Sequence, residues 1–406
     1  MFSATSTIRK AEDSVPQSSH PVARGRPKLA IITEIIAPYR IPIFNALAKR
    51  RGLDLHVVFL SENDPALRSW RVYKEEIEFQ YNVLPSWRQR IGQHNILINR
   101  AVARTLSAIA PDVVLCGGYN YPASWQAAYW AKRHNVPFLL WSESTALDNR
   151  RASVEIEFLK KRFLDMCDAF VVPGASAAGY LRALRASPRI FQAPNAVNTD
   201  FFSKRAADIR QGKLRPQIGG LLPSRFFLFV GRIVGAKGIF ELLAAYERMH
   251  SEIRREVGLV LAGDGEDRPE AMVRASAIAP GDIRFTGFMH REELAELYTL
   301  AEALILPTHS DTWGMVVNEA MACGLPVIVT HVAGCASDLV EDGWNGILIR
   351  PHDPSELAAA MMSVAGASDA RSQMAARGLK RIKAYSPAAW AEGVARAVAS
   401  VCPERI

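Results

Sequence analysis

Short apolar runs recur along the first half of the chain, and stretches of helical character separate them. The runs are Leu29–Thr33, Asp54–Leu60, Asp112–Cys116, Phe138–Trp141 and Ala169–Val172. Helices are predicted between them at Pro42–Arg51, 94–110, 122–134 and 151–167. Strands that alternate with helices predict parallel βαβ units and a doubly wound sheet.

The rhythm breaks at 203–224, a polar stretch with two prolines and a Gly-Gly pair, which we interpret as an interdomain linker. The alternation then restarts. The expected strands are Phe226–Val230, Gly258–Ala262, Ile283–Thr286, Ala303–Pro307 and Pro326–Thr330. The expected helices are Gly238–His250, 267–277, Arg291–Ala301 and Trp313–Cys323. These strands are almost entirely apolar, as expected when helices cover both faces of a parallel sheet.

The chain of 406 residues is therefore predicted to be an α/β protein with two Rossmann-like doubly wound domains, 28–202 and 225–384. Residues 1–27 are expected to be a disordered leader, and residues 385–406 a C-terminal helix that packs back on the first domain. Two such domains facing each other create a deep cleft at the carboxyl ends of both sheets. Ligands bind there because loops and helix N-termini present free N–H groups.

The net charge of +8 is unevenly distributed. Residues 1–200 carry 26 Lys and Arg against 17 Asp and Glu, whereas residues 201–406 carry 23 against 24, so the two halves are expected to meet different partners. No apolar run approaches the ~20 residues of a membrane span, and no secretory signal is recognised. Five cysteines without CxxC spacing suit a reducing cytoplasm and argue against disulfides or a structural zinc.

The most informative stretch runs from Pro307 to Ile328. Gly314, in the predicted first helical turn, lets a ligand approach the backbone, and the N–H groups of Trp313, Gly314 and Met315 are expected to be unpaired helix-start donors. Asp311 precedes the helix and Glu319 lies about two turns into it, so the two carboxylates can reach opposite ends of an extended ligand. The alternative is that Asp311 caps the helix and Glu319 is solvated.

A second stretch places Gly231-Arg232 after a strand and Lys237-Gly238 at a helix start. Two cations and the helix dipole can hold a diphosphate and stabilise it as a leaving group, although a basic surface turn is the alternative. Two weaker signals are turns after strands. One contains Gly263, and the other is followed by Phe288 and Met289, either of which could face a nucleobase.

These motifs, together with Pro194-Asn195-Ala196-Val197-Asn198, occur in the order found in the large fourth family of retaining glycosyltransferases, and residues 28–400 resemble that family. The resemblance implies the GT-B fold and retaining transfer of a hexose from a nucleotide diphosphate sugar. It implies a glycan or polyprenyl-diphosphate-linked acceptor, a place in bacterial surface or exopolysaccharide biosynthesis, and no cofactor beyond the nucleotide sugar as co-substrate.

The resemblance also implies residue roles. Arg232 and Lys237 match the diphosphate-binding pair, and Glu319 matches the second Glu of the Glu-x7-Glu motif, which holds the ribose. The backbone at 313–315 matches the loop that binds the sugar hydroxyls. Asp311 stands where the family has the first Glu, which leaves the choice of sugar open.

In the N-terminal domain the family's Gly-Gly turn is replaced by a segment containing Tyr39 and Arg40. Arg40 is expected near a helix N-terminus, where it binds acceptor or donor phosphate or is a surface arginine. Glu143 follows a strand and is our candidate for polarising the acceptor hydroxyl, with a capping or ion-paired glutamate as the alternative. Gly118 and Tyr119, on another strand-end loop, are expected to line the acceptor site.

Metal-independent catalysis is predicted, because the histidines (among them His94, His134, His290, His309 and His331) show no His-x3-His spacing and no Asp-x-Asp motif occurs. The basic excess of the first half, including Lys160-Lys161-Arg162 among apolar residues, fits an interfacial helix on an anionic membrane, and equally a solvated face. The alternatives are a GT-B-type nucleotide-sugar epimerase and an inactive sugar-nucleotide-binding subunit. No nucleic-acid-binding motif is present.

Overall fold

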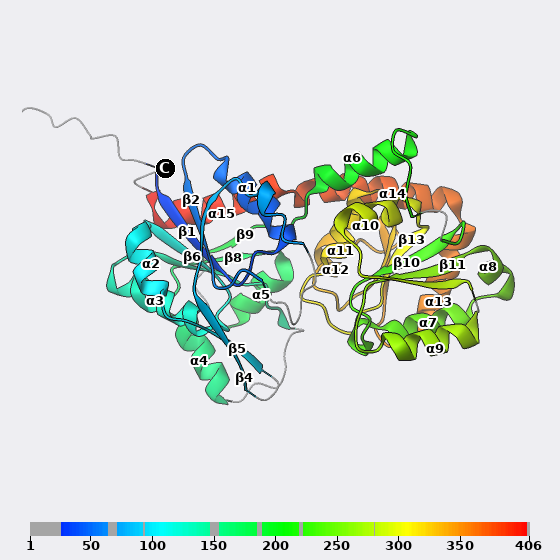
Figure 1. Ribbon diagram of the computed structural model, residues 1–406, viewed down its shortest axis with the longest axis horizontal. Helices are drawn as coiled ribbons and strands as arrows, with labels where there is room; N and C mark the ends of the chain where they lie inside the picture. The colour runs from blue at the N-terminus through cyan, green and yellow to red at the C-terminus, as the bar shows by residue number, and fades with distance from the viewer. Residues whose placement is uncertain are drawn as a thin grey trace, which may run out of the picture.

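The computed structural model describes residues 26–63, 71–91, 94–146, 154–184, 189–218, 222–279 and 281–403. The first 25 residues of the expected leader lie outside the described residues, as do Arg150 and Arg151, which contribute to the basic excess of the first half. Figure 1 shows two lobes side by side, each built on a sheet covered by helices. The prediction of an α/β protein with two doubly wound sheets is confirmed.

The N-terminal lobe contains a seven-stranded parallel sheet with the order β3-β2-β1-β6-β7-β8-β9. Its strands are β1 (Lys28–Thr33), β2 (Asp54–Phe59), β3 (Gln80–Val83), β6 (Val113–Gly117), β7 (Phe138–Trp141), β8 (Ala169–Val172) and β9 (Ile190–Gln192). Alternate residues of β1 enter different cores: Leu29 and Ile31 face one side of the sheet, whereas Ala30 and Ile32 face the other. Both faces are therefore buried.

Helices cover the two faces of this sheet unequally. The core that contains Leu29 lies under α1 (Ile41–Ala48) and α15 (Pro387–Val401). The opposite core lies under α2 (Val102–Ile109), α3 (Pro122–Arg133), α4 (Val154–Leu164) and α5 (Ala175–Ala183). The C-terminal helix α15 thus belongs to the N-terminal lobe, where it contacts α1, β8 and β9, and Figure 1 shows it in red in that lobe.

The C-terminal lobe contains a six-stranded parallel sheet with the order β12-β11-β10-β13-β14-β15. Its strands are β10 (Phe226–Val230), β11 (Gly258–Ala262), β12 (Ile283–Gly287), β13 (Ala303–Leu306), β14 (Val327–Thr330) and β15 (Gly346–Ile349). One face packs on α6 (Thr199–Arg210), α10 (Arg291–Leu300), α11 (Met315–Ala322), α12 (Ala336–Leu339) and the end of α14 (Ser368–Ile382). The other packs on α7 (Ile239–Arg248), α8 (Ser251–Glu256), α9 (Arg268–Ile278) and α13 (Pro354–Gly366).

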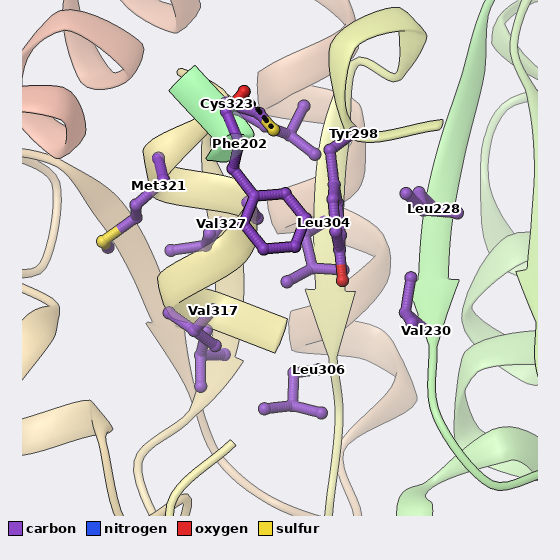
Figure 2. Packing of buried hydrophobic residues seen from close by; sticks show 14 of the residues in the cluster. Phe202, Leu228, Val230, Tyr298, Leu304, Leu306, Val317, Met321, Cys323 and Val327 are labelled. Atoms are coloured by element: carbon purple, nitrogen blue, oxygen red, sulfur yellow. Dashed lines mark hydrogen bonds between the residues drawn. The ribbon is translucent and has the colours of Figure 1, made fainter. Parts of the chain in front are cut away.

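The predicted linker at 203–224 is wrong in its first part, because residues 199–210 form α6. The Asn198 side chain caps this helix by accepting a hydrogen bond of 3.1 Å from the Phe201 N–H. Phe202 carries the apolar face of the helix into the core of the C-terminal lobe. Figure 2 shows its ring between α11 and Tyr298 of α10. The centroids of the Phe202 and Tyr298 rings are 6.1 Å apart. A polar sequence here conceals a helix with a narrow buried stripe.

The helix predicted at 94–110 is also wrong in its first part. Residues 94–99 form β5 (His94–Asn99), which pairs with β4 (Ser86–Ile91) as an antiparallel hairpin, and α2 begins only at Val102. The buried Asn99 side chain ends the strand by donating to the carbonyl oxygens of Leu60 and Pro85. The apolar run in β5 fits strand and helix alike, and the sequence pattern does not predict its partner strand β4.

The cysteines are all free thiols, as predicted, and four of the five are buried. Within the described residues, no helix combines the length and apolar composition that a membrane span requires.

Candidate functional site

Three glycine turns meet at the carboxyl edge of the C-terminal sheet. The Gly231 N–H donates to the Ala262 carbonyl at 3.0 Å, and the Gly263 N–H donates to the Gly287 carbonyl at 2.8 Å. A Cβ atom on Gly263 would stand 1.8 Å from the Gly231 carbonyl oxygen, so only glycine fits. Phe288 follows the third turn with an exposed ring, whereas Met289 packs partly against the core.

The predicted anion site is a tight turn at the start of α7. Residues 235–237 form the 3-10 turn η5 (Gly235–Lys237), and Gly238 has a left-handed φ of 72°. The Lys237 ammonium contacts Asp311 Oδ2 at 2.5 Å, and both side chains are about one-fifth exposed. The Arg232 side chain is exposed and makes no hydrogen bond or ion pair within the part of the chain that the structure describes. Within the described ranges, the motif thus places a paired cation, Lys237, and an unpaired one, Arg232, in the segment between β10 and α7.

Asp311 uses both carboxylate oxygens within the protein. Oδ2 contacts Lys237, and Oδ1 accepts a hydrogen bond of 3.1 Å from the Trp313 N–H. The expectation that the Trp313 N–H is unpaired is therefore wrong, and α11 begins only at Met315, after Gly314 at φ 92°. The N–H groups of Gly314 and Met315 make no hydrogen bond among the described residues, so this pair remains available as donors.

The Trp313 indole is buried and structural. Its Nε1 donates to Asn318 Oδ1 at 2.9 Å, and Asn318 Nδ2 donates to the Asn195 carbonyl at 2.9 Å. Asn195 belongs to the segment between β9 and α6, where the chain passes from one lobe to the other. This buried chain of hydrogen bonds fixes the loop before α11 relative to the crossover.

Glu319 lies on α11 beside Tyr298, whose hydroxyl donates to Glu319 Oε2 at 2.7 Å. Burial raises the pKa of the Glu319 carboxyl to about 7, and the hydrogen bond from Tyr298 offsets only part of this effect. The alternative of a fully solvated Glu319 is therefore wrong. Tyr298, 21 residues earlier in the chain, has no local sequence signal that links it to this site.

A second cluster lies at the carboxyl edge of the N-terminal sheet. Arg40, in the 3-10 turn η1 (Pro38–Arg40), donates to Thr33 Oγ1 at 2.7 Å and lies 3.6 Å from Glu143 Oε1. Its guanidinium stacks 4.6 Å from the Trp141 ring centroid. Burial opposes the charge, but the negative potential of Tyr39, Glu143 and Glu34 outweighs it and raises the pKa of Arg40. Arg40 is thus held as a permanent cation beside Glu143.

Gly118 joins this cluster through its backbone. Its N–H donates to the Trp141 carbonyl at 3.1 Å, and its φ of 90° requires glycine. Tyr119 instead turns toward the core, with its ring 5.9 Å from that of Phe163. No hydrogen bond or ion pair among the described residues joins the Arg40–Glu143 pair to the Lys237–Asp311 pair. The predicted site residues therefore form two groups, one in each lobe.

Sequence spacing missed a third group in which Glu241 lies between two histidines. Glu241 Oε1 is 3.0 Å from His309 Nε2 and 3.4 Å from His352 Nδ1. The two imidazole rings have centroids 3.7 Å apart. The three residues come from α7, the loop after β13 and the loop after β15, so no short spacing in the sequence could reveal them.

Solved structures resemble the arrangement of the two lobes. HepE of Anabaena in complex with UDP and glucose superposes with a TM-score of 0.72, at 16% identity, over 92% of this chain and 100% of that chain. Two facing Rossmann-like domains of this kind define the GT-B fold, as predicted.

Family models match both lobes. Residues 212–381 match the model of the glycosyl transferases group 1, and residues 43–201 match that of glycosyltransferase family 4. The chain belongs to this family of glycosyltransferases.

Curated relatives include D-inositol 3-phosphate glycosyltransferases. That of Xylanimonas cellulosilytica is 31% identical over 195 residues, which cover 46% of this chain and 46% of the relative. That of Frankia alni is 33% identical over 210 residues, which cover 50% of this chain and 51% of the relative. The chain thus spans about half the length of these relatives.

Proposed function

We propose that the protein is a retaining glycosyltransferase that moves a hexose from a nucleotide diphosphate sugar to a hydroxyl of a glycan or lipid-linked acceptor. The observation that carries the proposal is the set of segments that follow β10 and β13 at the carboxyl edge of the C-terminal sheet. It places the free Arg232, the Lys237–Asp311 pair, the unpaired N–H groups of Gly314 and Met315, and Glu319 on the loops and helix starts that follow parallel strands. Anionic ligands bind at such an edge.

In this proposal Arg232 and Lys237 bind the diphosphate of the donor. Among the residues that the structure describes, Arg232 has no partner to exchange. Lys237 keeps its contact with Asp311 and shares its remaining N–H donors with the ligand. Asp311 thus holds the lysine in position. Glu319 accepts hydrogen bonds from the ribose hydroxyls, and the N–H groups at 314–315 bind the sugar hydroxyls. Phe288, Met289 and the Gly263 turn border the nucleoside.

In the proposed transfer step, the protein stabilises the negative charge that develops on the departing diphosphate. The acceptor oxygen forms a bond to the anomeric carbon on the face from which the diphosphate leaves. The bond from that carbon to the phosphate oxygen breaks, and the departing phosphate oxygen takes the acceptor proton. Arg232 and Lys237 stabilise the developing negative charge without a metal ion. The Arg40–Glu143 pair positions the acceptor, with Tyr39, Gly118 and Tyr119 near it.

We propose that the enzyme acts in the cytoplasm in polysaccharide biosynthesis. Its acceptor is proposed to lie at an anionic membrane surface. On α4 the apolar Phe158 and the basic Lys161 and Arg162 are exposed and share one face, since they are three and four residues apart. Lys160 does not contribute to this face, because it is buried against Tyr180. The basic excess of the first half supplies further attraction.

An Arg232→Ala variant tests the assignment of the donor site. We expect release of nucleoside diphosphate from UDP-, GDP- or ADP-sugars to fall at least ~100-fold, because a charge-stabilising donor of this kind typically contributes that much to the rate. Arg255→Ala, which removes an exposed arginine of α8, is the matched control and is expected to retain activity. Unchanged turnover of the Arg232 variant would exclude the proposed role. Stereochemical analysis of the product tests retention.

A nucleotide-sugar epimerase is the alternative within this fold. The same assay separates the two, because an epimerase converts one nucleotide sugar into another without transferring the sugar to an acceptor.

A further inference from the structure

We propose that Glu241, His309 and His352 form a binding site for one Zn²⁺ ion, distinct from the proposed donor site. We call these three residues the histidine cluster. Each residue offers one ligand atom, and these atoms lie within 4.8 Å of one another. Two imidazole nitrogens and one carboxylate oxygen form a ligand set that zinc uses in proteins, with water in the fourth position.

The distances fit coordination. Tetrahedral zinc with ligands at about 2.0–2.1 Å places neighbouring ligand atoms about 3.3 Å apart. In the histidine cluster Glu241 Oε1 is 3.0 Å from His309 Nε2 and 3.4 Å from His352 Nδ1. Two of the three ligand separations therefore fit coordination as they stand, and the third, between the two histidine nitrogens, is within 4.8 Å.

Two atoms of the cluster lack hydrogen bonds. His309 Nε2 and Glu241 Oε2 are buried and have no hydrogen-bond partner among the described residues. A buried polar atom without a partner is costly, so such atoms call for an explanation. Although His309 Nε2 lies 3.0 Å from a carboxylate oxygen, the ring N–H direction does not make a hydrogen bond to it. A cation bound to His309 Nε2 and to the Glu241 carboxylate satisfies the histidine nitrogen without that alignment and compensates the charge of the carboxylate.

The backbone also supports the arrangement. His352 has a left-handed φ of 60°, which costs free energy for a residue other than glycine. This conformation occurs where the His352 side chain reaches Glu241. The His309 N–H donates to the Ala236 carbonyl at 3.0 Å, which fixes a second ligand against the turn before α7. Two of the three ligands are thus on backbone segments with defined geometry.

The nearest cations along the chain are neutralised by other groups. Lys237 is paired with Asp311, and Arg350 is paired with Asp353 and Glu356. Lys237 and Arg350, the basic residues nearest to Glu241 and His352 in the sequence, are therefore already paired with carboxylates. Neither needs the Glu241 carboxylate as its partner, which leaves that carboxylate to a divalent cation. Two of the three ligand atoms are imidazole nitrogens. Zn²⁺ binds such nitrogens readily, whereas Mg²⁺ and Ca²⁺ take oxygen ligands.

Bound zinc would join α7, the loop after β13 and the loop after β15. His309 is two residues before Asp311, so the ion would hold the loop that positions Lys237. This role is structural, and the proposed transfer step does not pass through the ion.

Equilibrium dialysis of the full chain, freed of any affinity tag and of metal, tests the site with Zn²⁺ followed by elemental analysis. We expect one zinc ion per chain and a higher midpoint of thermal unfolding with zinc than with Mg²⁺. His352→Asn removes an exposed ligand, and asparagine tolerates the left-handed backbone. Glu241→Gln keeps the shape of its side chain. Both variants should bind zinc at least ~10-fold more weakly, since even indirect partners of metal ligands are worth that much.

His250→Asn is the matched control, because it makes the same change at an exposed histidine outside the cluster. It is expected to bind zinc as the unaltered chain does. The proposal is overturned if the unaltered chain retains no stoichiometric zinc, or if the His352 and Glu241 variants bind it as tightly as the control. These readouts do not depend on sugar transfer, so they fail or succeed independently of the proposed function.

Discussion

Folding changes the ionisation of the Glu319 carboxyl group. Burial brings its pKa to about 7, from an ordinary value of 4.5, and Tyr298 donates to the same carboxyl at 2.7 Å. The folded chain therefore keeps a proton that the unfolded chain releases between these two values. This group makes the free energy of unfolding decrease as the pH rises from about 4.5 to about 7.

The same shift predicts a pH dependence of donor binding. The ionised carboxylate accepts hydrogen bonds from ribose better than the neutral acid does, and it predominates above pH 7. Calorimetric titration with UDP-glucose as the probe should therefore show affinity falling by up to about tenfold between pH 8 and pH 6. Glu319→Gln should bind weakly at both pH values. Equal affinity of the unaltered chain at the two pH values would contradict the ribose-binding role.

Some residues that the sequence motifs single out are neighbours in the structure. The Lys237–Asp311 pair and the Arg40–Glu143 pair both join residues that were predicted as candidates. What the motifs could not reveal are partners from distant segments. Tyr298 beside Glu319, and His352 beside Glu241, depend on which strands become neighbours in the sheet.

At the scale of the elements, the strands β10, β11 and β13 match the predicted ranges closely, because strands buried on both faces are short continuous apolar runs. The sequence pattern does not predict the edge strand β15, and two further elements differ in type from the prediction. The sequence predicts a linker where most of α6 forms, and the start of a helix where β5 forms. In both, tertiary contacts decide the structure, and the amino-acid pattern alone fits two interpretations.

The turn before α7 depends on glycine for two separate reasons. Gly238 has a φ of 72°, and a Cβ atom there would stand 2.0 Å from the Pro307 carbonyl oxygen. Gly212 has a similar φ of 70° but no atom within 4 Å of such a Cβ. Comparing alanine at the two positions therefore separates backbone strain from the steric clash.

We expect Gly212→Ala to lower the free energy of unfolding by about 1–2 kcal/mol, the cost of a left-handed alanine. Gly238→Ala should lower it by a further ~1–3 kcal/mol, because the clash forces the loop after β13 to move. Urea denaturation followed by circular dichroism measures both. If the two variants are equally stable, the close approach of this turn to Pro307 is not as described.

At the scale of the whole molecule, charge and exposed apolar side chains make the two lobes different. The first 200 residues carry a surplus of nine positive charges, and α4 exposes Phe158 and Leu159 near Lys161 and Arg162. The second half is nearly neutral, so its proposed anion site depends on a few placed cations. An anionic surface would therefore attract the N-terminal lobe.

Sedimentation with phosphatidylglycerol vesicles checks this expectation. The chain should pellet with the vesicles at low salt and remain in solution at about 1 M NaCl, where charges are screened beyond ~3 Å. A Phe158→Ser/Leu159→Ser variant should lose most of the binding. Met272→Ser/Val273→Ser, which alters two neighbouring exposed apolar residues on α9, is the matched control. Equal sedimentation of the two variants would argue against α4 as the contact.

The position of α15 sets an order of events during synthesis. Its Trp390 is fully buried, with its ring 5.7 Å from Phe44 and 5.2 Å from Trp141, so it completes the core of the lobe that is translated first. Roughly 200 residues separate the end of that lobe's sheet from the end of α15, and ribosomes need on the order of 10–40 s to add them. During that interval the apolar side chains of α1 and of the sheet that α15 later covers are exposed to solvent. We therefore expect chaperones to bind the nascent N-terminal lobe until its last helix emerges.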